Sequence, residues 1–114
     1  MEKIVKLQLD NNIIVRIQGL DQLVNLRWLD LSFNLIEKID GLEKNKELED
    51  LSLYNNCISE LTPDLKGPGP LDNLVKLNVL SIGKNKLTKL EDMLKYLKRF
   101  KRLQVLKIEE NEFK

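Results

Sequence analysis

The chain has 114 residues, with 19 basic and 18 acidic side chains and a formal net charge of +1. This length allows one ordinary domain, and the near-neutral charge argues against a dedicated nucleic-acid-binding protein. The sequence has no histidine and a single cysteine, Cys57, which excludes imidazole catalysis and an intrachain disulfide and is typical of a reducing compartment. No apolar run reaches the roughly 20 residues that a membrane-spanning helix needs, so we expect no membrane contact.

A short apolar motif that ends in asparagine, LxxLxLxxN, occurs five times along the chain. Its copies follow one another after 22, 22, 29 and 26 residues and begin at Ile4, Leu26, Leu48, Leu77 and Leu103. Five copies in one register are identified as leucine-rich repeats, which stack so that each contacts only its neighbours. We therefore predict one domain over residues 1–114, an α/β solenoid. Short parallel strands are expected on its concave face, and 3₁₀ turns with one or two short helices on its convex face.

The alternation of apolar residues within each copy predicts which side chains face the interior. The leucines of the LxL segment point inward, and the residues around them line the concave face, where curvature gathers side chains from several repeats. We predict that this face binds protein through Trp28, Phe33, Tyr54, Asp10, Asp30, Asp50, Val79 and Val105.

Three aromatic residues of this set indicate an anchor for a partner. Trp28 occupies an outward strand position, where a large apolar side chain is costly to leave exposed, and Trp and Tyr are enriched among interface hot spots. We predict an anchor built on Trp28, Tyr54 and Phe33. The alternative is that Trp28 only covers a neighbouring side chain.

The three aspartates of the set fall on neighbouring repeats. Because stacked strands lie about 4.8 Å apart, we expect Asp10, Asp30 and Asp50 to form a diagonal acidic stripe rather than a buried pair. A solvated concave surface is the favoured interpretation, and a weak divalent-cation site is the alternative.

The asparagine that ends each motif lies where the chain turns away from the strand. Its amide can serve backbone donors and acceptors of neighbouring turns, which an apolar side chain cannot do. We predict a structural ladder of Asn12, Asn34, Asn56, Asn85 and Asn111. In the first two repeats Gly19 and Gly41 follow, and we expect each to mark a turn with positive φ.

Two repeats are longer than 22 residues. The fourth copy starts seven residues late because of a loop insertion over residues 62–71, which is rich in proline and glycine. Before the fifth copy, apolar residues at helical spacing predict an amphipathic helix over residues 90–101, with Asp92 or Thr88 as its cap. The repeats start almost at residue 1 and end at Phe113, so we expect the chain to be a module of a longer protein.

Basic residues concentrate near this helix. Residues 1–62 have a net charge of −4 and residues 63–114 a net charge of +5. The basic patch consists of Lys95, Lys98, Arg99, Lys101 and Arg102. It is either the solvated face of the helix or a surface that docks on an acidic partner such as tubulin or an acidic coiled coil. Nucleic acid is not expected, because no aromatic stacking platform apart from Tyr96 lies among these lysines.

Catalytic groups are scarce in this sequence. Cys57 has no histidine to activate it, and the segment 83–86 lacks the spacing of a phosphate-binding loop. We predict a non-enzymatic protein with no cofactor, no metal site and no small-molecule substrate.

Five segments match more than the repeat itself, and they resemble the leucine-rich repeat domain of the dynein regulatory complex subunit 3 family. They are residues 7–14 (LQLDNNII), 28–34 (WLDLSFN), 48–56 (LEDLSLYNN), 74–85 (LVKLNVLSIGKN) and 96–100 (YLKRF). The resemblance covers most of the chain and includes positions that the repeat does not require, namely Trp28, Phe33 and 98–100. The loop at 67–70 departs from the family pattern.

This resemblance implies a cytoplasmic scaffold subunit of the axoneme in cilia and flagella. Such a subunit binds other subunits of the complex and helps to regulate dynein-driven sliding. Two alternatives remain open: an adaptor similar to a dynein light chain or a phosphatase regulator, and a spliceosomal leucine-rich repeat protein.

Overall fold

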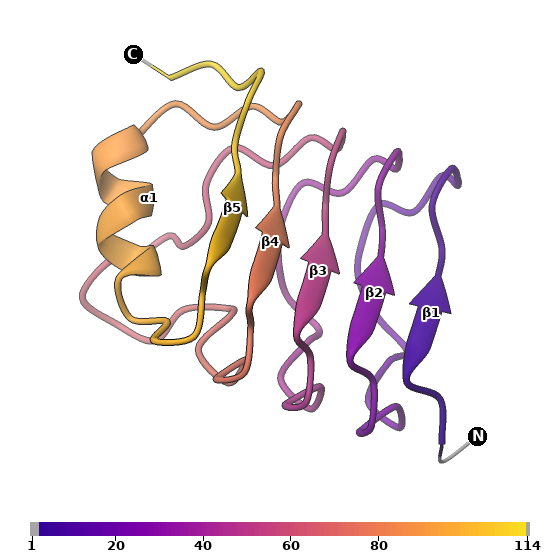
Figure 1. Cartoon of the computed structure of the whole chain (residues 1–114). Helices are drawn as coiled ribbons and strands as arrows, with labels where there is room; N and C mark the ends of the chain where they lie inside the picture. The colour runs from indigo at the N-terminus through magenta and orange to yellow at the C-terminus, as the bar shows by residue number, and fades with distance from the viewer. Residues whose placement is uncertain (1–2, 114) are drawn as a thin grey trace.

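Five short parallel strands form one sheet in a computed structural model that describes residues 3–113 (Figure 1). The predicted domain therefore extends beyond the described part at both ends. The strands are β1 (Lys6–Gln8), β2 (Trp28–Asp30), β3 (Asp50–Ser52), β4 (Val79–Ser81) and β5 (Val105–Lys107), with the helix α1 (Leu90–Leu97) between the last two. They lie side by side in chain order, and each copy of the motif contributes one strand. The predicted solenoid of parallel strands is confirmed.

The core is built from equivalent apolar positions of successive repeats. The central residue of each inner strand, Leu29, Leu51 and Leu80, has 0% exposure, and the register pairs these three with one another. At the two ends of the sheet, Leu7 and Leu106 are partly buried, because each has a neighbouring strand on one side among the described residues. The alternation of apolar residues in the strands thus determines which side chains form the core.

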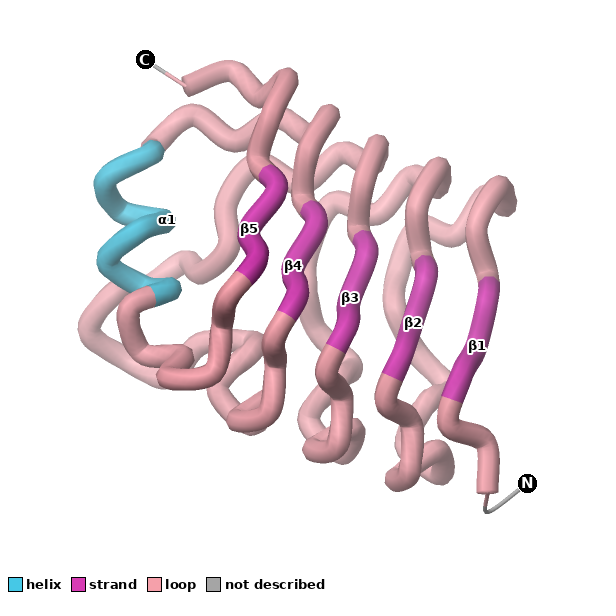
Figure 2. The backbone as a smooth tube through the Cα atoms, viewed as in Figure 1, coloured by secondary structure: helices cyan, strands magenta, loops and turns pink. Residues whose placement is uncertain are grey.

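Loops form the wall opposite the sheet (Figure 2). In the second repeat, Leu23 N–H donates to the carbonyl of Leu20, and Leu26 N–H donates to that of Leu23, at 3.0 and 3.2 Å. The same pair of i to i+3 bonds recurs at 42–48 and at 71–77. Single 3₁₀-type turns therefore precede β2, β3 and β4, and in the described part of the chain α1 is the one helix. No helix there is long and apolar enough to cross a membrane.

The helix is shorter than the sequence predicted, and its predicted cap is wrong. It begins after Lys89, whose side chain makes no capping bond, and Asp92 lies inside its first turn. It ends at Leu97 because the chain tightens there: the N–H of Phe100 donates to the carbonyl of Leu97, three residues back. The acidic first turn still complements the helix dipole.

Gly19 and Gly41 have φ values of +79° and +74°, as predicted. The two positions differ in their surroundings. A Cβ on Gly41 would overlap the carbonyl oxygen of Ile17, whereas Gly19 has open space around it. Gly41 is therefore required both by its conformation and by the close approach of the preceding repeat.

Candidate protein-interaction surface

Asparagine side chains join each repeat to the preceding one by hydrogen bonds to its backbone. The Oδ1 of Asn34 accepts the N–H of Ile14 in the preceding repeat at 3.0 Å, and its Nδ2 donates to the carbonyl of Leu9 at 3.1 Å. Three further asparagines repeat this pair of bonds to their own preceding repeats: Asn56, Asn85 and Asn111.

Asn12 differs, because its Nδ2 donates within its own turn, to the carbonyls of Leu9 and Asp10. A further buried asparagine, Asn45, donates to the carbonyls of Leu20 and Leu23 on the convex side. The sequence analysis missed Asn45, although a polar residue at a spacing of three from leucines on either side was a signal.

The residue before each ladder asparagine has a left-handed backbone. The φ values lie between +50° and +62° at Asn11, Phe33, Asn55, Lys84 and Glu110. Asparagine tolerates this region, whereas an aromatic residue there is strained. Phe33 is thus held in an unfavourable conformation with its side chain 44% exposed. The sequence analysis did not predict this turn geometry.

Phe33 and Tyr54 form an aromatic pair at one rim of the concave face. Their ring centroids are 5.6 Å apart in an edge-to-face arrangement, and Phe33 N–H donates to the carbonyl of Tyr54. Edge-to-face packing stabilises such pairs. The pair lies just beyond the ends of β2 and β3, so two of the three predicted anchor residues are in contact.

We call a row of outward side chains that the register pairs across the strands a rank. Trp28 lies in the first rank, between Lys6 on β1 and Asp50 on β3. Lys6 Nζ is 4.6 Å from the centroid of the indole ring, a cation–π contact. Trp28 is partly buried, so it covers a neighbour and also remains accessible. Both interpretations of this residue therefore have a structural counterpart.

The three aspartates do not converge. Asp30 Oδ1 accepts the N–H and the hydroxyl of Ser32, at 2.9 and 2.6 Å, and an oxygen of Asp10 accepts Nδ2 of Asn11. Among the described residues, no group of three or more acidic or cysteine side chains could hold a metal ion. The acidic stripe is part of an open surface.

Asp50 is the exception among these carboxylates. Its carboxylate has neither a hydrogen bond nor an ion pair with any residue that the structure describes. Burial raises the pKa of its carboxyl group above the ordinary value, the attraction of Lys107 opposes that shift, and the negative charge of Asp30 adds to it. The register continues the same rank through Val79, which is partly buried, to Val105, which is 41% exposed.

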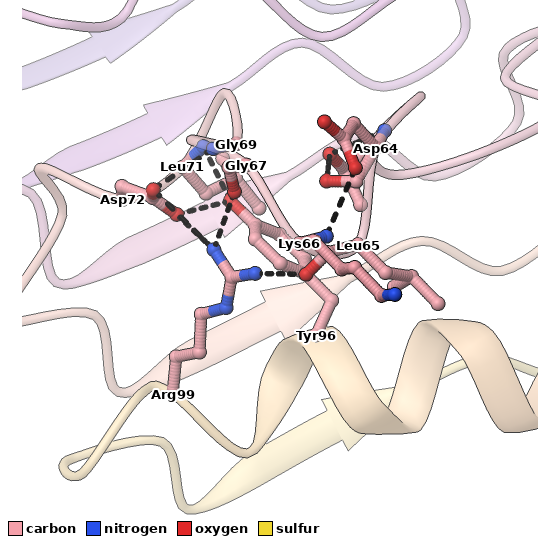
Figure 3. Close-up of polar contacts among 10 residues, drawn as sticks. Asp64, Leu65, Lys66, Gly67, Gly69, Leu71, Asp72, Tyr96 and Arg99 are labelled. Carbon is pink, nitrogen blue, oxygen red and sulfur yellow. Dashed lines mark hydrogen bonds and ion pairs between the residues drawn. The ribbon is translucent and has the colours of Figure 1, made fainter.

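All five residues of the basic patch are exposed: Lys95, Lys98, Arg99, Lys101 and Arg102. Arg99 also reaches the insertion loop, where its guanidinium donates to the carbonyls of Leu65 and Gly67 and pairs with Asp72 at 3.4 Å (Figure 3). Arg99 therefore has a structural role in holding the loop, and docking of the patch on an acidic partner stays a prediction.

Tyr96 fixes the same loop from α1. Its buried hydroxyl donates to Asp72 Oδ1 and accepts the N–H of Leu71, both at 2.9 Å (Figure 3). Burial raises the pKa of this hydroxyl, with a smaller opposing effect from the Leu71 N–H. A Cβ on Gly69 would overlap the ring of Tyr96, so the glycine permits the close approach. The sequence analysis missed this role, since nothing local links Tyr96 to a loop 25 residues earlier.

Comparison with known sequences matches part of the chain to a repeat family. A family model described as leucine-rich repeats, in two copies, matches residues 24–67. A search of curated proteins gives no match.

Solved structures show the same fold over nearly the whole chain. Internalin C2 from Listeria monocytogenes is 29% identical, with a TM-score of 0.77 over 96% of this chain and 43% of that one. The leucine-rich repeat domain of APL1B is 25% identical, with a TM-score of 0.83 over 97% of this chain and 32% of that one. A complex of TLR13 with the RNA ssRNA13 is 26% identical, with a TM-score of 0.64 over 93% of this chain and 18% of that one.

The chain therefore spans less than half the length of each of these proteins. Its fold and its matched repeats define a leucine-rich repeat solenoid, a class that generally serves as a non-enzymatic module for protein interaction. These matches give no support to the more specific resemblance to the dynein regulatory complex subunit 3 family.

Proposed function

We propose that the chain is a protein-interaction scaffold whose concave face holds its partner, and that it acts in the axonemal dynein regulatory complex in the control of ciliary and flagellar motility. The observation that carries the scaffold proposal is the rank Trp28–Asp50–Val79. An aromatic, an unpaired carboxylate and an apolar side chain lie next to one another there on an open sheet face. Such a mixture is typical of interfaces, whose energy is concentrated in a few aromatic or charged residues.

The axonemal proposal is supported by residues that the repeat itself does not require. Of these, Arg99 and Phe100 have structural roles, since Arg99 holds the loop and Phe100 is buried. Trp28 and Phe33 lie on or beside the concave face, where the fold needs no aromatic residue. The family resemblance therefore depends mainly on these two residues.

The location is tested by expressing the tagged chain in ciliated cells and imaging it. We expect axonemal signal, and proximity labelling on intact axonemes should mark other subunits of the regulatory complex. A nuclear signal would instead favour the spliceosomal alternative. Cytoplasmic signal without axonemal labelling would favour an adaptor of the phosphatase-regulator kind.

The binding face is tested with Trp28→Ala. We expect loss of the labelled neighbours with the fold retained, as judged by circular dichroism. Val75→Ala is a matched control, because it removes apolar surface from a residue that is 64% exposed and outside the strands. Equal labelling by wild type and a folded Trp28→Ala variant would reject the concave face as the binding site.

A further inference from the structure

Two carboxylates occupy the centre of the concave face on neighbouring strands. Asp50 on β3 pairs in register with Trp28 on β2 and with Val79 on β4. Asp30 belongs to the next rank of β2, two residues after Trp28 and on the same face. We call Trp28, Asp30, Asp50 and Val79 the central surface.

No ion pair among the described residues neutralises the central surface, although Lys107 attracts Asp50 from β5. The ion pairs of the described residues join Arg16 with Asp40, Arg27 with Glu49, Lys76 with Glu47 and Arg99 with Asp72, so none involves Asp30 or Asp50. The lysines of the concave ranks lie at the outer strands, Lys6 on β1 and Lys107 on β5. The two carboxylates therefore lie between Lys6 and Lys107, and a third carboxylate, Asp10, follows the end of β1.

Asp50 has the surroundings of an interface carboxylate. It is partly buried between an aromatic and an aliphatic side chain, and its charge is desolvated without a partner in the described chain. A carboxylate in that position lowers the stability of the free domain. A cation from a binding partner would offset this cost, because a charge pair is stronger where water is displaced.

Trp28 fits the same ligand chemistry. Its indole already holds one cation, Lys6 Nζ, at 4.6 Å from the ring centroid. Arginine and lysine side chains stack on indole rings and bury their aliphatic stems against apolar surface. Val79 provides such surface on the opposite side of Asp50.

We propose that the central surface binds a protein segment that presents one lysine or arginine to Asp50 and Asp30, with an adjacent apolar side chain packed on Trp28 and Val79. This inference rests on the proposed function of the concave face and specifies the chemistry of its partner. A single cation is the fitting occupant, since Lys6 and Lys107 repel a longer basic run that extends over β1 or β5.

The test uses a phage-displayed library of random peptides, selected on the immobilised full chain. We expect the enriched peptides to share a lysine or arginine next to an apolar residue. The best synthetic peptide should bind Asp50→Asn about tenfold more weakly than wild type, with an affinity that falls as salt rises. Asp21→Asn is the matched control, because Asp21 is exposed and outside the strands, and it should bind like wild type.

The outcomes separate this inference from the function on which it rests. Peptides that need Trp28 but carry acidic or purely apolar residues, or that bind Asp50→Asn as well as wild type, would overturn the basic partner and leave the binding face intact. A selection in which no peptide depends on Trp28 would overturn both. Asp50→Asn preserves the size of the side chain, and its circular dichroism spectrum should match that of wild type.

Discussion

The first three repeats and the last two hold their neighbours by different means. The first three follow at 22-residue intervals, and the same asparagine bonds join each to the next, as at Asn34 and Asn56. The last two keep these bonds but contain an insertion and a helix, which are joined by contacts that occur once, those of Tyr96, Asp72 and Arg99.

The difference explains where the proposed binding residues are available. In the regular repeats, inward leucines, buried asparagines and Gly41 maintain the fold, so outward strand positions such as those of Trp28 and Asp50 are free for aromatic and acidic residues. In the irregular repeats, Arg99 and Asp72 are engaged in holding the insertion against α1. The structural residues and the proposed binding residues are therefore more clearly separated in the regular repeats than in the irregular ones.

The largest expected effect is the loss of a ladder asparagine between regular repeats. Asn56→Ala leaves the N–H of Ile36 and the carbonyls of Leu31 and Leu53 without their buried partner. We expect the free energy of unfolding to fall by about 3–5 kcal/mol, since each buried unpaired group costs about 1–3 kcal/mol. Urea unfolding measures this. Asn12→Ala is the control, and because Asn12 is exposed its loss should cost less than about 1 kcal/mol.

Close approach between two regular repeats is tested by Gly41→Ala. The added Cβ overlaps the carbonyl oxygen of Ile17 and is strained at positive φ. We expect a loss of about 2–3 kcal/mol in urea unfolding. Gly19→Ala has the strain without the overlap and should cost about 1 kcal/mol. Equal effects of the two substitutions would show that the approach of Ile17 is unimportant.

The irregular half is tested by Tyr96→Phe. The variant removes the hydroxyl that accepts Leu71 N–H and donates to Asp72, while the ring still packs edge-to-face on Phe100. We expect a loss of about 1–2 kcal/mol. Hydrogen exchange should rise at residues 65–72 while the amides of β2 and β3 stay protected. Uniform exchange over both halves would contradict the separate role of the insertion contacts.

The smallest effect on stability is expected at Asp50, and it depends on pH. The raised pKa means that protonated Asp50 favours the folded state, so its contribution is present below the ordinary pKa of 3.8 and is lost as pH rises through the folded-state value. Asp50→Asn should therefore be slightly more stable than wild type at neutral pH and equal to it in acid. Urea midpoints of wild type and Asp50→Asn at several pH values measure this.

The repeated part of the structure follows from the residue pattern alone. The inward positions of Leu29 and Leu51, the turn at each ladder asparagine and the positive φ of Gly41 follow from a pattern that recurs along the chain. Such features are local: alternation assigns a face, and a glycine permits a backbone region, whatever the rest of the chain does. Because the copies are alike, the same local signal recurs in each repeat.

The contacts that occur once depend instead on the three-dimensional packing of the chain. Arg99 faces the carbonyls of Leu65 and Gly67, and Tyr96 meets Leu71, across 25 to 34 residues of chain. Lys6 lies over Trp28 because the register of β1 and β2 places them side by side. These outcomes depend on how an insertion folds back and how strands align, which are properties of packing between distant segments. No periodic signal in the sequence encodes them.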